Sequence, residues 1–354
     1  MAEVIVIGAG MAGSVAAHAL TTAGHRVVVV DKGFAVGGRM AARSVAGARF
    51  DVGAQFLTAK SPTFKAMTAR WAEEGVVRTW FHGSPDREAP RDPDGHPRLR
   101  GTPTMRRIVE HVSSGLDVRL GQVVEAITPA GRRVDVHLAA RPSDTPPRLG
   151  GPPAAASPEQ PSPRATLQAD AVLATMPIPQ TRAVLAAGGA TLSGDAQDRL
   201  AAASYDPCLT VLAVPEGSTS LPARGAVRDP EGDVTWITDH LVAGTSTRPA
   251  LTIHAGAEYS RDRFETDAEV VRREVAQLAA PLLGTTARAV HLHRWRYAQP
   301  TAALGDAPLV DRIGDVPFAV AGDAFRGGRV EGAALSGLDT AEALIAALAV
   351  PQMR

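Results

Sequence analysis

The feature that most constrains this chain is a glycine fingerprint close to its N-terminus, Gly8-x-Gly10-x-x-Gly13. The continuous apolar run Val4–Ile7 comes directly before it and predicts a buried parallel strand. Ala12–Ala23 follows and predicts a helix. A strand, a glycine-rich turn and a helix in this order indicate the start of a Rossmann-type α/β domain that binds a dinucleotide.

Each fingerprint glycine has a separate predicted role. Gly8 makes the tight turn, Gly10 lets the backbone approach a diphosphate, and Gly13 allows close packing of helix and strand. The diphosphate would lie at the helix N-terminus. After a second predicted strand, Arg26–Val30, Asp31 is expected to accept hydrogen bonds from the adenosine ribose. The alternative is a glycine-rich turn that binds nothing, and the fingerprint by itself does not separate NAD from FAD.

Two weaker motifs follow at opposite ends of the chain. The loop Gly37-Gly38-Arg39 carries an arginine suited to bidentate pairing with phosphate, although an exposed loop arginine is the alternative. Near the C-terminus, the predicted strand Pro317–Ala321 ends in Gly322-Asp323, and a helix is expected near Glu331–Ala347. The N–H groups at the start of that helix would face the pyrimidine edge of a flavin. The alternative for Gly322-Asp323 is a plain turn.

Composition excludes several classes of protein. The length of 354 residues favours about two domains. The 37 basic side chains balance 37 acidic ones, which argues against a nucleic-acid binder or a polybasic membrane-surface protein. A single cysteine, Cys208, excludes an internal disulfide, and His291-x-His293 is the only paired histidine spacing, so no metal site is expected. No targeting segment and no apolar run of about 18 residues is visible, so we expect a cytoplasmic protein with no membrane span.

The remaining segments predict both helices and strands. Helices are expected over Pro62–Gly75 and Pro103–Val112, and a surface loop over Gly83–Gly101. Residues 205–300 are expected to be mostly β, interrupted by one helix, Asp267–Ala279. Further strands are predicted at Val118–Ile127, Arg133–Leu138 and Thr166–Thr175. Residues 141–164 are rich in Pro, Ala, Gly and Ser, so we expect a disordered insertion without catalytic meaning.

In this order the motifs resemble those of the FAD-dependent amine-oxidase-like flavoproteins, and among them those of the renalases most. The resemblance spans nearly the whole chain. Besides the motifs above it rests on Phe50–Thr58, Tyr205–Cys208, His293–Ala298 and Ala321–Gly337. The segments Asp51-Val52-Gly53-Ala54-Gln55 and Trp295-Arg296-Tyr297-Ala298 are the specific ones, since the fingerprint and the Gly-Asp motif occur in many flavoproteins.

The resemblance implies a two-domain, p-hydroxybenzoate-hydroxylase-like α/β fold with non-covalent FAD. A Rossmann-type FAD domain would comprise 1–60, 101–185 and 301–354, and a mainly antiparallel β substrate domain 61–100 and 186–300. The turn Gly53–Phe56 would face the isoalloxazine ring and the main chain of Val124 would contact adenine. The implied cofactor-binding residues are Gly8, Gly10, Met11, Ala12, Gly13, Asp31, Lys32, Gly38, Arg39, Met40, Gly53, Ala54, Gln55, Phe56, Val124, Gly322, Asp323, Val330, Glu331 and Ala333.

The implied activity is oxidation of dihydro isomers of NAD(P)H that are reduced at the 2 or 6 position of the nicotinamide ring. Hydride would pass to flavin N5 and the electrons then to O2, giving β-NAD(P)+ and H2O2. No general base is required, because the ring nitrogen lone pair expels the hydride. The protein supplies position and a dry wall.

Four side chains are candidates for the catalytic wall: Gln55, Trp295, His254 and Trp236. Gln55 would be a polar residue on the flavin face, and the two tryptophans would stack on a nicotinamide ring. Core packing for the tryptophans, a structural role for the histidine and a turn hydrogen bond for the glutamine are the alternatives. Strand alternation predicts that Trp295 and Arg296 face opposite sides, so only one of them points inward.

Two other functions remain open. A flavin amine oxidase or desaturase would share the fold, but many amine oxidases hold a lysine near flavin N5 from the second half of the chain, and here none follows Lys65. Their C-terminal aromatic pair is represented only by Phe325, and no cysteine follows Cys208 to bind flavin covalently. The other possibility is a protein that binds FAD without turnover.

Overall fold

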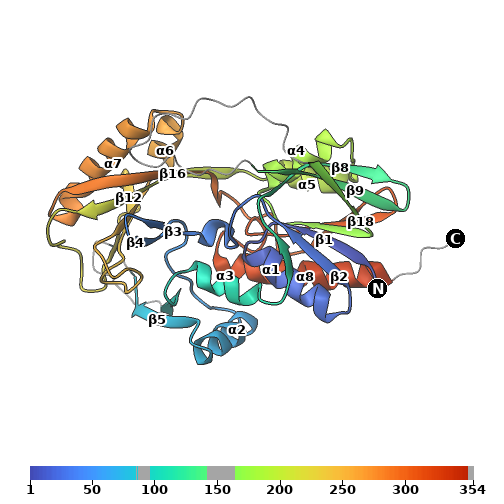
Figure 1. Ribbon diagram of the computed structural model, residues 1–354, viewed down its shortest axis with the longest axis horizontal. Coiled ribbons are helices and arrows are strands. Elements are labelled where there is room, and N and C mark those ends of the chain that lie inside the picture. The colour runs from blue at the N-terminus through green and yellow to red at the C-terminus, as the bar shows by residue number, and fades with distance from the viewer. Residues whose placement is uncertain (85, 87–95, 142–163, 350–354) are drawn as a thin grey trace.

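The fold is described from a computed structural model covering residues 1–84, 86, 96–141 and 164–349. The insertion predicted within 141–164 therefore lies outside the described residues, apart from its two ends. Figure 1 shows two parts, with the N-terminus and the end of α8 at the far side of one of them. One part contains β1, β2, β18, α1 and α8, and the other contains α6, α7 and the long strands β12 and β16.

A mostly parallel sheet forms the centre of the first part. Among the described residues its strand order is β17 (Leu309–Ile313), β18 (Val316–Val320), β11 (Ala171–Ala174), β1 (Glu3–Ile7), β2 (Arg26–Val30) and β7 (Asp117–Arg119). All neighbours pair in parallel except β17 and β18. Because its strands come from both ends and the middle of the chain, this part is discontinuous in sequence. The Rossmann-type sheet predicted from the glycine fingerprint is confirmed.

Both faces of this sheet are buried, which explains its continuous apolar strands. In β1, Val4 and Val6 pack with α1 (Met11–Thr22) and α8 (Val330–Ala349). Ile5 and Ile7 point to the other face. That face is covered by α4 (Ile178–Ala187), α5 (Gly194–Ala201) and the sheet of β8 (Gln122–Ala130), β9 (Arg133–Ala140) and β10 (Arg164–Ala169). The result is a three-layered domain.

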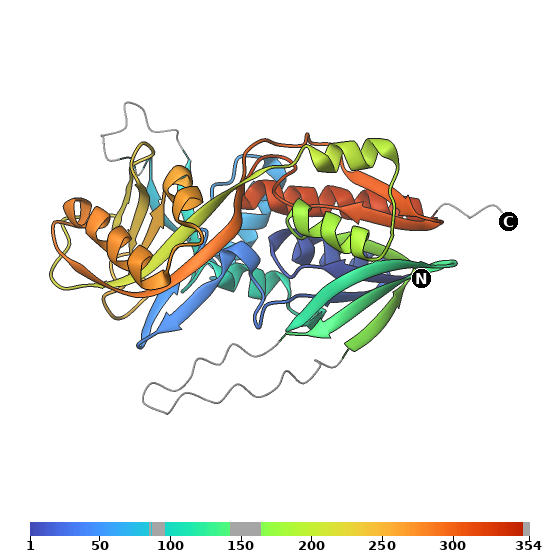
Figure 2. The ribbon, with the colours of Figure 1, turned by 90° about the horizontal axis from the view of Figure 1, so that it is seen from above.

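The second part is built on an antiparallel sheet. Its order is β13 (Ala226–Arg228), β14 (Val234–Asp239), β15 (Leu251–Ala255), β12 (Tyr205–Pro215) and β16 (Ala287–Pro300). Figure 2 shows β12 and β16 running from this part toward the first. Leu209, Val211, Ile237 and Ile253 lie on the apolar face, against α7 (Ala268–Leu283). The opposite face carries polar and aromatic side chains and turns toward β4.

The remaining elements join the two parts. They are the hairpins of β3 (Ala42–Val45) with β4 (Ala48–Asp51) and β5 (Val77–His82) with β6 (Pro97–Gly101), the short helix η1 (Gly38–Met40), α2 (Pro62–Glu73) and α3 (Arg106–Val112). Phe64 and Trp71 of α2 pack in one cluster with Met11, Ile108 and Leu335. Thus α2 packs on helices of the first part. The assignment of residues 61–100 to a substrate domain stays a prediction.

Four local predictions were wrong. The single strand predicted at Thr166–Thr175 is two strands, β10 and β11, which belong to different sheets. The loop predicted over Gly83–Gly101 ends in strand β6, whose inward positions are arginines and so conceal the alternation. The region 205–300 was expected to contain one helix, but it also contains α6 (Ala257–Arg263). The short polar sequence of α6 has no apolar periodicity, so the sequence pattern did not indicate it. The strand predicted at Val118–Ile127 is two strands, since Gly121 turns the chain at φ +68°.

Helices α1 and α8 cross at very short range. A Cβ on Gly337 would lie 2.3 Å from the carbonyl oxygen of Ala12. The 20-residue α8, with a mean hydropathy of 1.3, is long and apolar enough to cross a membrane by length and composition. Its buried residues Ala334, Ala341 and Leu344 pack on α1 and the parallel sheet. Buried core helices can have the same length and apolar composition as a membrane-spanning helix.

We expect Gly337→Ala to destabilise the protein by about 1–3 kcal/mol, because the added methyl group overpacks the helix crossing. Urea unfolding followed by far-UV circular dichroism measures the change. Gly194→Ala is the control, since that glycine starts α5 with open space around its Cβ position. Equal effects of the two substitutions would contradict the close crossing.

Candidate active site

The fingerprint loop needs glycine at the two positions where the backbone is most constrained. Gly8 has φ +114° and its N–H donates to the carbonyl of Val30 at 2.8 Å, which ties the turn to β2. A Cβ on Gly13 would lie 1.9 Å from the Gly8 carbonyl oxygen. Only glycine lets α1 begin this close to the turn.

The carboxylate of Asp31 holds the same loop from the end of β2. One oxygen accepts from Ala9 N–H at 2.7 Å and the other from Gly33 N–H at 2.6 Å. Each carboxylate oxygen has two lone pairs, so both oxygens keep the capacity to accept a ribose hydroxyl. The ribose role of Asp31 stays a prediction.

The N-terminus of α1 fits a diphosphate. Gly10 is its N-cap residue, no side chain caps the helix, and no acidic residue lies in the first turn. A Cβ on Gly10 would meet nothing within 4 Å, whereas one on Gly38 would lie 3.4 Å from the Gly10 Cα atom. The Gly37-Gly38 loop thus lies against the fingerprint, and no side chain caps the N–H groups at this end of α1. These are the features that an anion at a helix N-terminus requires.

Within the protein, Arg39 pairs with an acidic side chain. Its two terminal nitrogens donate to the carboxylate of Asp323 at 2.6 and 2.5 Å. Asp323 was itself expected to contact the cofactor. This bidentate pair joins two motifs that lie 284 positions apart in the sequence. It uses one N–H of each terminal nitrogen of the guanidinium, so a phosphate would have to bind the remaining N–H groups. Phosphate binding by Arg39 stays a prediction.

Several other predicted cofactor-binding residues make contacts within the protein. The carboxylate of Glu331 accepts from the backbone N–H groups of Lys60 and Ser61, with the shortest contact at 2.7 Å. Lys32 Nζ lies 3.4 Å from Gln180 Oε1, and burial lowers its pKa. Val124 is buried in β8 beside a bulge. Met11, Met40, Val330 and Ala333 contribute to one apolar cluster around α1 and α8.

The turn after β4 is pressed against the Gly37-Gly38-Arg39 motif. Ala54 N–H donates to the Arg39 carbonyl at 2.9 Å, and a Cβ on Gly53 would lie 2.0 Å from the same oxygen. Gly53 is therefore required by the close approach of two backbones. The Gly37-Gly38-Arg39 loop and the Gly53–Phe56 turn are therefore in direct contact, although only the family resemblance linked them in the sequence.

The carbonyl oxygen of Val52 brings together two of the four predicted wall residues. His254 Nε2 lies 3.2 Å from it and Trp295 Nε1 lies 3.4 Å from it. Trp295 thus faces the turn. Arg296 faces away, stacks on Phe264 at 4.4 Å and pairs with Glu265 at 2.7 Å, as strand alternation predicts.

The third wall residue, Trp236, extends this surface across the sheet. Trp236 on β14 pairs in register with His254 on β15, and His254 pairs with Thr210 on β12. The Trp236 ring lies 5.4 Å from the ring of Phe56, which ends the turn. Trp236, His254 and Trp295 therefore form one wall against Val52–Phe56, and we call these three residues the aromatic wall.

The wall carries no charge at neutral pH. Burial lowers the pKa of His254 to about 4, and His293, whose ring lies 4.1 Å from that of Trp295, is lowered to about 4 as well. Burial raises the pKa of the Cys208 thiol to about 11, so it stays protonated. The wall therefore presents rings and neutral groups rather than an acid–base pair.

Gln55 braces the turn. Its Nε2 atom donates to the carbonyls of Asp51 and Gly53, both at 2.8 Å. The opposite amide orientation would set an oxygen against two carbonyl oxygens. The turn hydrogen bond left open by the sequence is therefore present, and the Oε1 atom is buried without a hydrogen-bond partner. The catalytic role of Gln55 stays a prediction.

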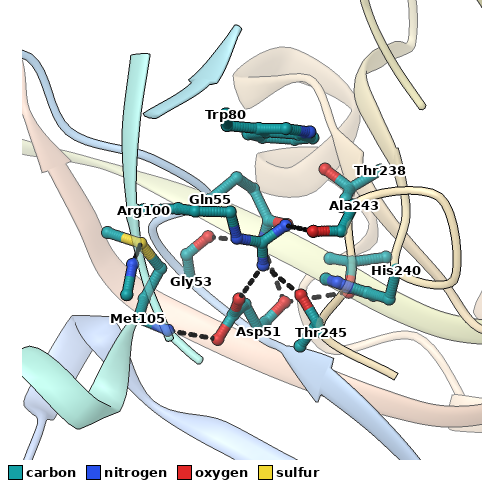
Figure 3. Close-up of polar contacts among 12 residues, drawn as sticks. Asp51, Gly53, Gln55, Trp80, Arg100, Met105, Thr238, His240, Ala243 and Thr245 are labelled. Carbon is teal, nitrogen blue, oxygen red and sulfur yellow. Dashed lines mark hydrogen bonds and ion pairs between the residues drawn. The ribbon is translucent and has the colours of Figure 1, made fainter. Parts of the chain in front are cut away.

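A buried ion pair lies beneath the turn, and sequence reasoning missed it (Figure 3). Arg100 Nη2 donates to Asp51 Oδ2 at 2.9 Å, with side chains that are 1% and 0% exposed. Asp51 Oδ1 accepts from Met105 N–H at 2.8 Å, at the start of α3. Arg100 also donates to Thr245 Oγ1 and to the Ala243 carbonyl, so the pair joins β4, β6, α3 and a loop of the other domain.

Burial dominates the ionisation of this pair. It raises the pKa of Asp51 from 3.8 to about 6 despite the nearby guanidinium, and lowers that of Arg100 to about 10. Both groups are charged at pH 7 to 8. The ring of Trp80 covers the guanidinium at 4.9 Å. Arg98 and Arg100 occupy alternate positions of β6 and both are buried. This spacing was the one signal in the sequence that could have indicated the strand and its buried arginine. Among the residues that the structure describes, no group of three His, Cys, Asp or Glu side chains is arranged to hold a metal.

The architecture is that of flavin-dependent oxidoreductases. An Exiguobacterium protein provisionally described as a protoporphyrinogen oxidase has a TM-score of 0.66 at 14% identity, over 97% of this chain and 98% of its own. Putrescine oxidase bound to putrescine has a TM-score of 0.65 at 15% sequence identity, and the match covers 98% of this chain and 99% of its own. A fatty acid isomerase from P. acnes has a TM-score of 0.64 at 11% sequence identity, and the match covers 97% of this chain and 98% of its own. These likenesses show the shared fold, which serves different reactions.

Sequence comparison gives the family. A profile of NAD(P)-binding Rossmann-like domains matches residues 6–71, and one of flavin containing amine oxidoreductases matches residues 92–345. The chain belongs to the flavin containing amine oxidoreductase family. A Mycobacterium tuberculosis protein provisionally described as a flavin-containing monoamine oxidase is 41% identical over 80 residues, which span 23% of this chain and only 17% of that relative.

We expect Arg100→Met to cost about 3–5 kcal/mol, because it leaves the Asp51 carboxylate buried without a partner. The loss should grow from pH 5 to pH 8. The folded state binds the Asp51 proton more tightly than the unfolded state, so stability falls as pH rises through the raised pKa, which moves higher without Arg100. Urea unfolding at several pH values measures this.

The control is Arg70→Met, which breaks an exposed pair with Glu74 on one helix. It should leave the unfolding midpoint unchanged. A loss for Arg100→Met that is small, or the same at every pH, would contradict the proposed burial of the Asp51 charge.

Proposed function

We propose that this protein is an FAD-dependent oxidase of the renalase type, which oxidises the 2- and 6-dihydro isomers of NAD(P)H to β-NAD(P)+. The flavin would be bound non-covalently, and O2 would be the final acceptor and give H2O2. The family membership supports a flavin oxidoreductase. The choice of substrate rests on the chemistry of the aromatic wall.

The residues that would hold the FAD come from three motifs. The α1 N-terminus with Gly10 and Gly38 would bind the diphosphate, Asp31 the adenosine ribose, and the Gly53–Phe56 turn would face the ring system. When bound, the flavin accepts a hydride and passes its electrons to oxygen. The protein's own residues position the donor and exclude water.

The observation that carries this proposal is the uncharged aromatic wall. His254 is neutral and held by the Val52 carbonyl, Trp295 is half-buried, and Trp236 is 8% exposed. A dihydronicotinamide needs no base, because its own ring nitrogen releases the hydride. Positioning against flat apolar surfaces is the help that such a donor requires.

The same wall disfavours an amine substrate. No lysine follows Lys65, so no lysine from the second half of the chain reaches the turn. An alkyl amine is a cation at neutral pH, and the Asp51 carboxylate beneath the turn is buried and paired with Arg100. Amine oxidation, desaturation and flavin binding without turnover remain the alternative outcomes of the experiment below.

We expect rapid bleaching of the flavin absorbance near ~450 nm when the purified protein is mixed anaerobically with 2- or 6-dihydro-NAD. Ordinary β-NADH and benzylamine should leave the band unchanged. Bleaching by the amine alone would instead identify an amine oxidase. Bound flavin that none of these compounds reduces would indicate a protein without this activity.

We expect the limiting rate of flavin reduction by the dihydro isomers to be independent of pH between 7 and 9. The pKa of His254 is about 4, so the wall does not titrate in this range. Stopped-flow measurements at saturating substrate test this. A rate that rises tenfold per pH unit would contradict it, because such a slope indicates loss of a proton before hydride transfer.

A further inference from the structure

A second group of rings continues the aromatic wall away from the turn. The ring of Phe56 lies 5.4 Å from Trp236 and 6.4 Å from Phe81, and Phe81 lies 4.8 Å from Trp80. Phe56, Trp80 and Phe81 are only half-buried. Trp80 and Phe81 belong to none of the sequence motifs described above.

Two guanidinium groups lie against these rings. Arg98 lies 5.7 Å from the centre of the Phe56 ring, and Arg224 lies 5.9 Å from that of Phe81. We call Phe56, Phe81 and Arg224 the ring–arginine surface, because Arg98 is only 6% exposed. Arg224 is fixed by backbone carbonyls, with Nε donating to Ala226 at 3.1 Å. Within the described part of the chain no carboxylate pairs with Arg224, so its positive charge is not neutralised there.

The combination selects a particular ligand chemistry. Ring faces favour a flat, partly apolar group, and a guanidinium whose charge has no carboxylate partner favours a phosphate oxygen. A nucleotide carries both within a few ångströms. A cationic amine would gain nothing from the arginines.

We propose that the ring–arginine surface is a subsite for the phosphate-bearing nucleotide half of the substrate. This rests on the proposed function, since the surface adjoins the wall where the nicotinamide ring would lie. The ring of Phe56 lies 5.4 Å from that of Trp236 in the aromatic wall, so one extended dinucleotide would contact both surfaces. Arg224 is then a residue that determines specificity for dinucleotides over smaller dihydronicotinamides.

The test compares two substrates that share the reacting ring. Arg224→Gln should raise KM for 6-dihydro-NAD about 10-fold or more, because a charge-assisted hydrogen bond is lost, with kcat unchanged within about twofold. KM for the phosphate-free 6-dihydronicotinamide riboside should not change. Arg224→Lys keeps the charge and should recover part of the loss. The control is Arg261→Gln on α6, which pairs with Asp206 and should change neither KM.

A binding measurement separates this inference from the proposed function. ADP-ribose carries the nucleotide half and has no ring to oxidise, so calorimetry with the oxidised holoenzyme needs no turnover. Weaker ADP-ribose binding by Arg224→Gln supports the subsite even if dihydro isomers fail to reduce the flavin. Normal oxidation of both substrates, with equal KM values and equal ADP-ribose affinity in wild type and variant, would overturn the subsite and leave the proposed function intact.

Discussion

The buried pair of Asp51 and Arg100 is the interaction on which the site depends. Asp51 is the last residue of β4, and the turn that follows it approaches the Arg39 carbonyl and supplies the Val52 carbonyl to the wall. Its own carbonyl accepts from Gln55 and from Thr252 of the other domain. Breaking such a pair leaves a charge without solvent or partner, so the arrangement has few alternatives. A polar centre therefore fixes where the two domains meet.

The antiparallel sheet explains why the site forms at that junction. One face is apolar and packs on α7, so it is fixed by the hydrophobic effect. The period of two then sends Trp236, His254 and Trp295 to the opposite face, toward β4. The wall is thus a consequence of how the sheet packs, and the ring–arginine surface extends it through Phe56.

Much of the fold could be predicted from local pattern. The strands of the parallel sheet are short apolar runs, Gly8 adopts a φ of +114°, and a Cβ on Gly13 would lie 1.9 Å from the Gly8 carbonyl oxygen. Strand β6 could not be found this way, because its inward residue Arg100 is polar and is buried only by partners distant in sequence. The partner of Arg39 was missed for the same reason, since Asp323 lies 284 positions away.

The sequence by itself determined the dinucleotide-binding start, the alternation of Trp295 and Arg296, and the family motifs, because these depend on neighbours within a few residues. Only the tertiary structure decided that Gln55 donates to its own turn and that His254 and Trp295 share one carbonyl. It also decided that Asp51 is buried against Arg100. Those outcomes depend on which distant groups exclude water from each side chain, and burial is a property of the packed chain rather than of any local segment.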